Sequence, residues 1–297
     1  MVMARPAHTP VLLHEVVEAL HPSPGGCIVD CTIGPGGHAE ALLEQLGPSG
    51  LLIGIDADPD AIELSRSRLA RFGPSVILVN RSFTDITEVC HEHGVRTVDG
   101  ILFDLGLSST QIDTPERGFS FQRDAPLDMR FDPSQELTAS DIVNAYPEPE
   151  LARIIWEYGE ERRARRIARH IVRSRPITST ARLARLLEQV LGSRRGRIHV
   201  ATRTFMALRI AVNRELDSLR SALVQTPNLL APGGRLAVIS YHSLEDRIVK
   251  DFMRSQARDC ALHLVSRKVI RPGSLEIESN PRSRSAKLRI AERSRQQ

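Results

Sequence analysis

Short apolar runs alternate with helical patterns in the first third of the chain. Four runs have the length of buried strands, at 27–32, 51–56, 76–80 and 101–105. Between them, apolar residues recur three and four positions apart, which predicts helices at 39–46, 59–72 and 84–93. Asp58 and Pro59 supply a cap and a first-turn proline for the second of these helices. The alternation predicts an α/β fold with a parallel sheet covered on both faces.

This alternation stops after residue 111. Residues 112 to about 142 form a long loop rich in Pro, Asp and Arg, and its large apolar side chains predict order: Phe119, Phe121, Met129 and Phe131. From 148 to 191 the pattern is helical, with no strand-like run. The sequence therefore predicts an inserted, mainly helical domain at 112–214.

The α/β pattern returns near the C-terminus. It predicts a helix at 211–230, a turn at Ala-Pro-Gly-Gly, a strand at 235–240 and a helix at 244–257. Two further extended runs, at 262–269 and 287–291, are expected to close the sheet as an antiparallel pair. Residues 1–111 and 215–297 would then form one discontinuous domain.

Bulk composition excludes several classes of protein. The 297 residues contain no 18-residue apolar run and no apolar segment typical of a secretion signal, so we expect no membrane span and a cytoplasmic protein. Four cysteines in a chain of this length do not form a disulfide framework. Cys27 and Cys31 share one face of a predicted strand, and we interpret them as small buried hydrophobes rather than metal ligands. No metal site is predicted.

Charge is distributed unevenly along the chain. Residues 153–214 contain 16 Arg, no Lys and four acids, a net charge of +12, so the remainder carries −8 within the total of +4. A basic segment on an acidic body favours a polyanionic partner such as nucleic acid. The simpler interpretation is a solvated helix face in a chain that uses Arg almost to the exclusion of Lys, with 37 Arg and 3 Lys.

A glycine-rich turn follows the first predicted strand, and Asp56 ends the second. This arrangement is typical of doubly wound sheets that bind a nucleoside-containing cofactor. The backbone of the turn contacts one end of the cofactor, and a carboxylate binds its ribose. Gly34, Gly36 and Ala39 fit the dinucleotide pattern, so the turn alone permits a nicotinamide dinucleotide. S-adenosylmethionine (SAM) is the alternative, because its carboxylate also suits the N-terminus of a helix.

Two features favour SAM. The sheet is expected to end in an antiparallel pair after the fifth parallel strand, and Asp104 closes the fourth strand, where a methyltransferase would meet both cofactor and acceptor. A strand-end aspartate can instead cap the next helix. That reading is weak for Asp56, because Asp58 is the better-placed cap. For Asp104 it is weaker still, because Leu-Gly-Leu-Ser-Ser reads as a turn.

Nearly the whole chain resembles one family. In order along the sequence, the matching segments are H-T-P-V-L-L-H-E-V, T-I-G-P-G-G-H, D-L-G-L-S-S-T-Q, E-R-G-F-S-F, P-L-D-M-R, Y-G-E-E-R, A-T-R-T-F, S-Y-H-S-L-E-D-R-I-V-K and N-P-R-S-R-S-A-K-L-R-I-A-E-R. They are similar to the bacterial 16S rRNA (cytosine-N4)-methyltransferases. The resemblance implies a class I SAM-dependent methyltransferase fold with an inserted helical domain, SAM as donor, and a cytidine N4 amine in the decoding region of 16S rRNA as acceptor. It also suggests a homodimer.

The resemblance further implies the residues that contact the cofactor, namely Gly36, Gly37, His38, Asp56, Phe83, Asp104 and Gln111. Two of them have plainer readings, since Phe83 would also suit a core position and His38 would also suit a solvent-facing one. Asp104 is the candidate catalytic group, because a carboxylate can accept an N–H from the amine as positive charge develops on it, and a backbone carbonyl in Asp104–Gly106 is the alternative acceptor.

Other residues are expected to contact the RNA. A flipped cytidine would meet Ser108, Ser109, Asp128, Arg130, His242 and Ser243. For His242, positioning is favoured over a role as general base. Phosphates would be held by arginines at 162, 166, 169 and 173, together with Arg194, Arg195 and Arg197.

Two other functions compete with this hypothesis. A nicotinamide-dependent oxidoreductase would use the same glycine turn, although the set of motifs argues against it. A non-catalytic ribosome-assembly factor would keep the fold and bind rRNA through the basic insert. The intact glycine turn, Asp56 and Asp104 favour the enzyme over this second alternative.

Overall fold

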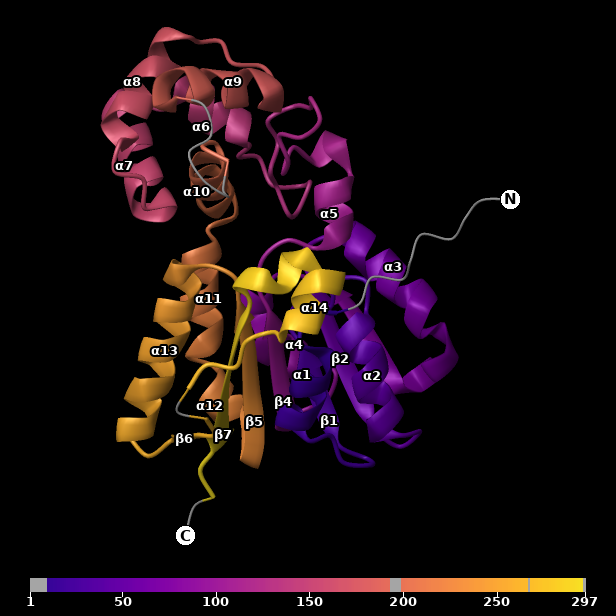
Figure 1. Cartoon of the computed structure of the whole chain (residues 1–297). Helices are drawn as coiled ribbons and strands as arrows, with labels where there is room; N and C mark the ends of the chain where they lie inside the picture. Colours follow the sequence, from indigo (N-terminus) through magenta and orange to yellow (C-terminus); the bar gives the residue numbers. More distant parts are fainter. Residues whose placement is uncertain (1–9, 193–198, 267, 296–297) are drawn as a thin grey trace. The chain divides into compact units, whose positions relative to one another are not determined.

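The computed structural model describes residues 10–192, 199–266 and 268–295. The chain forms two compact units: Met1–Gly106 with Leu216–Gln297, and Leu107–Glu215 (Figure 1). The second unit starts at Leu107 rather than at residue 112, so Ser108, Ser109 and Gln111 belong to it. No helix in the described part of the chain is both long enough and apolar enough to cross a bilayer.

The first unit is built on a seven-stranded sheet. Its strands are β1 (Cys27–Asp30), β2 (Leu51–Asp56), β3 (Val76–Asn80), β4 (Val98–Asp104), β5 (Leu230–Ser240), β6 (Leu262–Leu264) and β7 (Lys287–Arg293). They lie in the order β3-β2-β1-β4-β5-β7-β6. Strands β1 to β5 pair in parallel, whereas β7 is antiparallel to both β5 and β6. The predicted parallel sheet with a terminal antiparallel pair is confirmed.

Helices of the first unit cover both faces of this sheet. The helical elements are α1 (Leu13–Leu20), α2 (Gly37–Leu46), α3 (Pro59–Leu69), η1 (Ala70–Ser75), η2 (Phe83–Asp85), α4 (Ile86–Glu92), α11 (Glu215–Leu223), α12 (Thr226–Leu229), α13 (Ser243–Arg258), α14 (Ser274–Ser279) and η4 (Pro281–Ser285). Successive strand residues point to opposite faces. Ile28 packs with α1, α2 and α3, whereas Val29 packs with α4, α11 and α13. Strands buried on both faces explain the continuous apolar runs in the sequence.

The expected single helix at 211–230 is wrong. One helix ends at Asn213, because the next residue, Arg214, takes a left-handed conformation with φ of 49°. Helix α11 begins directly afterwards, at Glu215. A residue in this conformation ends a right-handed helix. Strand β5 already starts at Leu230, so the predicted Ala-Pro-Gly-Gly turn is part of the strand, where the pairing with β4 shifts register. The strand expected at 262–269 is also shorter, because β6 ends at Leu264.

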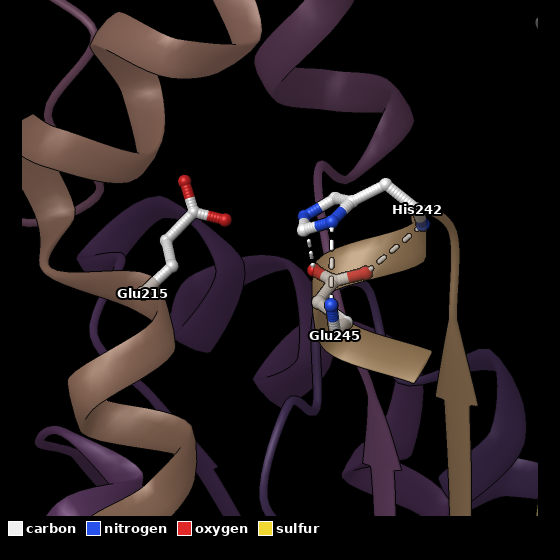
Figure 2. Close-up of side chains that lie close together, drawn as sticks. All are labelled: Glu215, His242 and Glu245. Carbon is white, nitrogen blue, oxygen red and sulfur yellow. Dashed lines mark hydrogen bonds and ion pairs between the residues drawn. The ribbon is translucent and has the colours of Figure 1, made fainter. Parts of the chain in front are cut away.

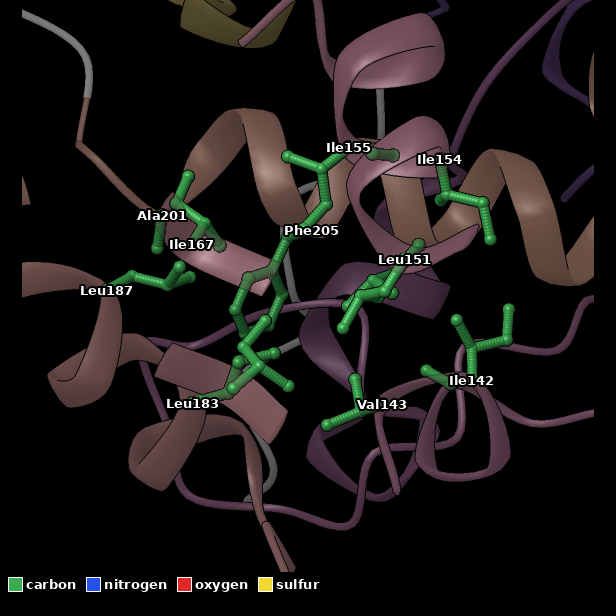
Figure 3. Packing of buried hydrophobic residues seen from close by; sticks show 14 of the residues in the cluster. Ile142, Val143, Leu151, Ile154, Ile155, Ile167, Leu183, Leu187, Ala201 and Phe205 are labelled. Carbon is green, nitrogen blue, oxygen red and sulfur yellow. The ribbon is translucent and has the colours of Figure 1, made fainter. Parts of the chain in front are cut away.

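The second unit is helical. It contains α5 (Ser109–Asp113), η3 (Pro115–Arg117), α6 (Ala139–Ala145), α7 (Glu148–Gly159), α8 (Ala164–Arg173), α9 (Thr180–Leu191) and α10 (Thr202–Asn213). Its core joins apolar side chains of these helices, as Figure 3 shows for Leu151, Ile155, Ile167, Leu187 and Phe205. No strand is present among the described residues of this unit, in agreement with the sequence prediction.

The long loop between η3 and α6 is packed against this helical core. Phe119 and Met129 are buried, and Phe121 and Phe131 pack against the same cluster. Asn213 fixes the loop, because its side chain accepts a hydrogen bond from the Phe131 N–H (2.7 Å) and donates one to the Met129 carbonyl (2.7 Å). The apolar residues of the loop therefore order it, as their spacing in the sequence predicts.

Candidate active site

Three aspartates stand at the carboxyl ends of adjacent strands. Asp56 ends β2, Asp30 ends β1 and Asp104 ends β4. Because β1 lies between β2 and β4, Asp30 occupies the middle of this row. Strand order reverses between β1 and β4, and the crevice outside such a switch point is where doubly wound sheets bind ligands. We call these three residues the aspartate row.

Asp30 is the member of the row that sequence reasoning missed. It is 1% exposed, and burial raises the pKa of its carboxyl to about 8, with the charges of Asp104 and Asp56 adding to the effect. The Thr32 N–H donates a hydrogen bond to it at 3.1 Å, which acts in the opposite direction. In the sequence Asp30 lies inside the predicted run at 27–32, whereas in the structure it ends β1, as Asp56 and Asp104 end their strands.

The glycine turn approaches the row through its backbone. Gly36 has φ of 79°, a conformation that favours glycine, and a Cβ on Gly37 would lie 2.4 Å from Pro10 Cγ. Asp56 accepts hydrogen bonds from the Gly34 N–H and the Asp58 N–H, both at 2.9 Å. The turn is therefore tied to the end of β2 by a carboxylate.

Asp58, not Asp56, caps the helix that follows β2. Its side chain accepts a hydrogen bond from the Asp60 N–H at 3.1 Å, and Pro59 occupies the first turn of α3. This confirms the predicted cap.

Several groups hold Asp104 in place. Its backbone N–H donates to Thr32 Oγ1 at 2.6 Å, and the Tyr241 hydroxyl donates to its Oδ1 at 2.9 Å. Burial and the charge of Asp104 raise the pKa of Tyr241, so the phenol stays a donor. Neither Thr32 nor Tyr241 stands out as a site residue in the sequence alone. Tyr241 orients the Asp104 carboxylate, and Thr32 anchors the Asp104 backbone.

His38 lies against Asp104 with its side chain buried. The ring is 6% exposed, with Nδ1 3.7 Å from Asp104 Oδ2 and Nε2 3.0 Å from the Val11 carbonyl oxygen. The solvent-facing reading of His38 is therefore wrong, because the Pro10–Leu12 segment covers this end of α2.

Phe83 follows β3 at the same edge of the sheet. Its ring is partly buried and meets the fully buried Phe103 edge to face, with centroids 5.6 Å apart. Phe83 contacts the core and is partly exposed, so its position suits both a core role and a cofactor contact.

His242 caps α13. Its Nδ1 accepts a hydrogen bond from the Glu245 N–H at 3.4 Å, and its Nε2 lies 3.1 Å from Glu245 Oε1 (Figure 2). The Glu245 carboxylate also accepts hydrogen bonds from the N–H groups of Tyr241 and His242. These contacts, with Ser243 as the first helical residue, give His242 a structural task at the end of β5 and favour positioning over proton transfer.

In the second unit, Ser108, Ser109 and Gln111 lie at the start of α5. A short helix does begin in the predicted Leu-Gly-Leu-Ser-Ser turn, and its cap is Ser108 rather than Asp104. The Gln111 N–H donates to Ser108 Oγ at 3.2 Å, while the Gln111 side chain accepts from the Ser108 N–H at 3.0 Å. Ser109 is the first residue of this helix.

Asp128 and Arg130 form a partly buried ion pair within the loop. The guanidinium donates to both carboxylate oxygens at 2.9 and 2.7 Å, and to the carbonyls of Pro133 and Gln135. Burial alone would raise the pKa of Asp128, but the hydrogen bonds and charge of Arg130 outweigh it and the pKa is lowered. Their contact with RNA stays a prediction.

Arginines of α8 form a basic face. Arg165, Arg166 and Arg173 are exposed and make no ion pair within the described residues, whereas Arg169 lies 3.6 Å from Glu148. The sequence pattern predicts one helix face for Arg162, Arg166, Arg169 and Arg173, but Arg162 precedes α8 and does not belong to that helix. The predicted contacts Arg194, Arg195 and Arg197 lie outside the described residues.

Known proteins match nearly the whole chain. Residues 5–294 match the model of the MraW methylase family. The chain is 54% identical to the ribosomal RNA small subunit methyltransferase H of Dehalococcoides mccartyi, covering 96% of this chain and 86% of the relative. It is 51% identical to the protein of that name from Syntrophotalea carbinolica, with 96% and 98% covered. An rRNA methylase structure from Streptococcus thermophilus aligns over 99% of both chains with 13% identity and a TM-score of 0.45. The chain belongs to the MraW methylase family.

Proposed function

We propose that this chain transfers a methyl group from SAM to the exocyclic N4 amine of a cytidine in the decoding region of 16S rRNA. Its family makes it a methyltransferase, and relatives at about 50% identity are named rRNA small subunit methyltransferases. The observation that carries the proposal is the aspartate row beside a glycine turn, at the switch point of the sheet.

The electrostatics of the row suit SAM. Three carboxyl groups end adjacent strands at this edge of the sheet, and burial together with the charges of Asp104 and Asp56 raises the pKa of Asp30. When bound, SAM supplies an electrophilic methyl on a positively charged sulfonium, and its amino group is also cationic. Positive groups near the row would relieve the crowding of like charges. The residues proposed to contact the cofactor are Gly36, Gly37, His38, Asp56, Phe83, Asp104 and Gln111.

Asp104 is proposed as the catalytic carboxylate. The lone pair of the cytosine amine is delocalised into the ring, so the nitrogen must become tetrahedral as it attacks, and positive charge develops on it. A fixed carboxylate that accepts one amine N–H stabilises that charge. The Tyr241 hydroxyl holds the carboxylate and Thr32 anchors the Asp104 backbone, which limits reorganisation during the reaction. The proton can leave after attack, so no strong base is required.

The basic face of α8 supports RNA as the acceptor. Many arginines of the first unit pair with acids, as Arg68 does with Glu40 at 2.8 Å. In contrast, Arg165, Arg166 and Arg173 have no such partner within the described residues. Unpaired guanidinium groups are suited to phosphates. Further contacts to the RNA are proposed for Ser108, Ser109, Asp128, Arg130, Arg162, Arg166, Arg169, His242 and Ser243.

The cellular setting completes the proposal. We place the enzyme in the cytoplasm, acting on 16S rRNA within the small ribosomal subunit, and as a homodimer. None of these three points is needed for the chemistry above.

The deciding experiment measures transfer of labelled methyl from SAM to small subunits purified from cells that lack this gene. Digested rRNA is analysed by mass spectrometry, and labelled N4-methylcytidine is expected. Asp104→Ala should abolish the label. Asp99→Asn is the control, because Asp99 is the second residue of the same strand and its side chain is exposed. Label on another nucleoside would discard the cytidine target, and full activity of Asp104→Ala would discard the catalytic role of Asp104.

A further inference from the structure

Trp156 is exposed on the outer side of α7. It is the chain's single tryptophan, and its side chain is 56% exposed. Within the described residues of Leu107–Glu215, it is the one large apolar side chain that is exposed. The helix buries its other face through Leu151, Ile154 and Ile155 (Figure 3), so α7 packs without using the indole.

Cationic side chains flank Trp156 along the helix. Arg153 lies one turn before it, about half exposed and paired with Glu157 at 2.6 Å. One turn after it, the Glu160 carbonyl accepts a hydrogen bond from Arg203 Nη1 at 3.3 Å. Residues three and four apart share a face of a helix. Arg153 therefore lies one turn before the indole, and Arg203 bonds to the C-cap residue of α7 beyond it.

The neighbouring helix adds further positive charge. Helix α8 packs against α7, and Arg169 of α8 lies 3.6 Å from Glu148 at the start of α7. The exposed Arg165, Arg166 and Arg173 come from the same helix. A lone exposed apolar residue is ordinary on a protein surface. A lone exposed indole in a segment of net charge +12 has the chemistry of a nucleic-acid contact instead.

We infer that Trp156 stacks on an unpaired nucleobase of the RNA, while the arginines around it hold the adjoining phosphates. The inference rests on the proposed function and adds a single-stranded segment to the RNA that the enzyme recognises. An indole offers a flat apolar face to any base, and Arg on either side attracts the phosphates that bracket it. Duplex RNA hides its base faces by stacking, so Trp156 selects unpaired RNA.

Trp156 also reports on its own contact, because no other tryptophan contributes to the fluorescence of the chain. A short single-stranded oligoribonucleotide is expected to quench its emission. Duplex RNA of the same length and heparin, a polyanion without bases, should leave the emission nearly unchanged at concentrations that saturate binding. Equal quenching by heparin would overturn the inference.

Affinity provides the second measurement, by anisotropy of labelled single-stranded RNA. Trp156→Ala should weaken binding about 5-fold to 150-fold, which corresponds to ~1–3 kcal/mol for one stacked base. Trp156→Phe should recover most of the loss. Val224→Ala, which shortens an exposed apolar side chain of the first unit, is the control and should bind like the parent. In methyl transfer, Trp156→Ala should raise KM for the RNA substrate with little change in kcat.

The outcomes separate the two proposals. If N4-methylcytidine forms normally and Trp156→Ala leaves RNA affinity unchanged, the stacking inference fails and the proposed function stands. If the parent chain neither methylates nor binds RNA, both fail. If intact small subunits quench Trp156 but no RNA does, the partner of this face is a protein and the inference is overturned.

Discussion

At the scale of single residues, Asp30 shows how position in a fold changes the chemistry of a side chain. An aspartate in water ionises near pH 3.9, whereas burial among two other carboxyl groups raises the pKa of Asp30 to about 8. A group whose pKa is higher in the folded state than in the unfolded state stabilises the fold less as pH rises. The affected window here extends from about pH 4 to about pH 8.

Asp30→Asn should remove this pH dependence. Asparagine does not ionise, so the free energy of unfolding of the variant, relative to the parent, should increase from pH 5 to pH 8. The Asn side-chain oxygen can still accept the Thr32 N–H. Denaturant unfolding without SAM at the two pH values checks this. An equal difference between variant and parent at both values would show that Asp30 does not titrate in this window.

At the scale of elements, the glycine turn depends on a close approach between two chain segments. A Cβ on Gly37 would lie 2.4 Å from Pro10 Cγ, well inside contact distance. Gly37→Ala should therefore displace Pro10–Leu12, lower the free energy of unfolding by about 1–3 kcal/mol and weaken SAM binding. Calorimetric titration with SAM and thermal unfolding measure both effects.

Gly273→Ala is the control for this substitution. Gly273 has φ of −70°, and nothing lies within 4 Å of the Cβ it would carry. Its stability and SAM affinity should match the parent. If Gly37→Ala behaves like Gly273→Ala, the N-terminal segment is not packed on the turn as described.

The cap of α13 gives a second prediction at this scale. His242→Ala removes the acceptor for the Glu245 N–H and should cost about 0.5–2 kcal/mol of stability. His242→Asn should recover most of it, because Asn is among the best N-cap residues. The midpoint of denaturant unfolding measures the difference. Equal midpoints for the two variants would rule out capping as the main task of His242.

At the scale of the whole molecule, charge is divided between the two compact units. The basic segment lies almost entirely in Leu107–Glu215, and α8 presents arginines that have no acidic partner within the described residues. Unpaired arginines bind phosphates by releasing counterions, so RNA affinity should fall steeply with added salt. A flat salt profile would contradict the role assigned to α8.

Two triple variants that lose the same positive charge test whether the unpaired arginines of α8 contact phosphates. The slope of log affinity for single-stranded RNA against log salt should decrease by about 2 in magnitude for the triple variant at Arg165, Arg166 and Arg173, since each phosphate contact contributes roughly 0.7. The matched control replaces three arginines that pair with acids in the first unit, Arg66, Arg71 and Arg220. Equal slopes in the two triple variants would show that net charge alone matters.

The sequence by itself determined the elements that depend on local pattern. Four apolar runs and their terminal acids predicted β1 to β4 and the positions of Asp56 and Asp104, because strands buried on both faces need continuous apolar residues. Asp58 and Pro59 marked the start of α3 for an equally local reason. The motifs that carry the family resemblance lie along nearly the whole chain, and the family follows from them.

Only the tertiary structure decided what depends on residues distant in the chain. The pKa of Asp30 is raised because the fold buries its carboxyl, and the strand order adds the charges of Asp104 and Asp56 beside it. Tyr241 reaches Asp104 across 137 positions of sequence, a contact that no local spacing encodes. Arg214 divides the helix expected at 211–230 through a backbone conformation that most side chains avoid and only the packed fold imposes. Local pattern specifies elements, whereas the chemistry of a site depends on which elements the fold brings together.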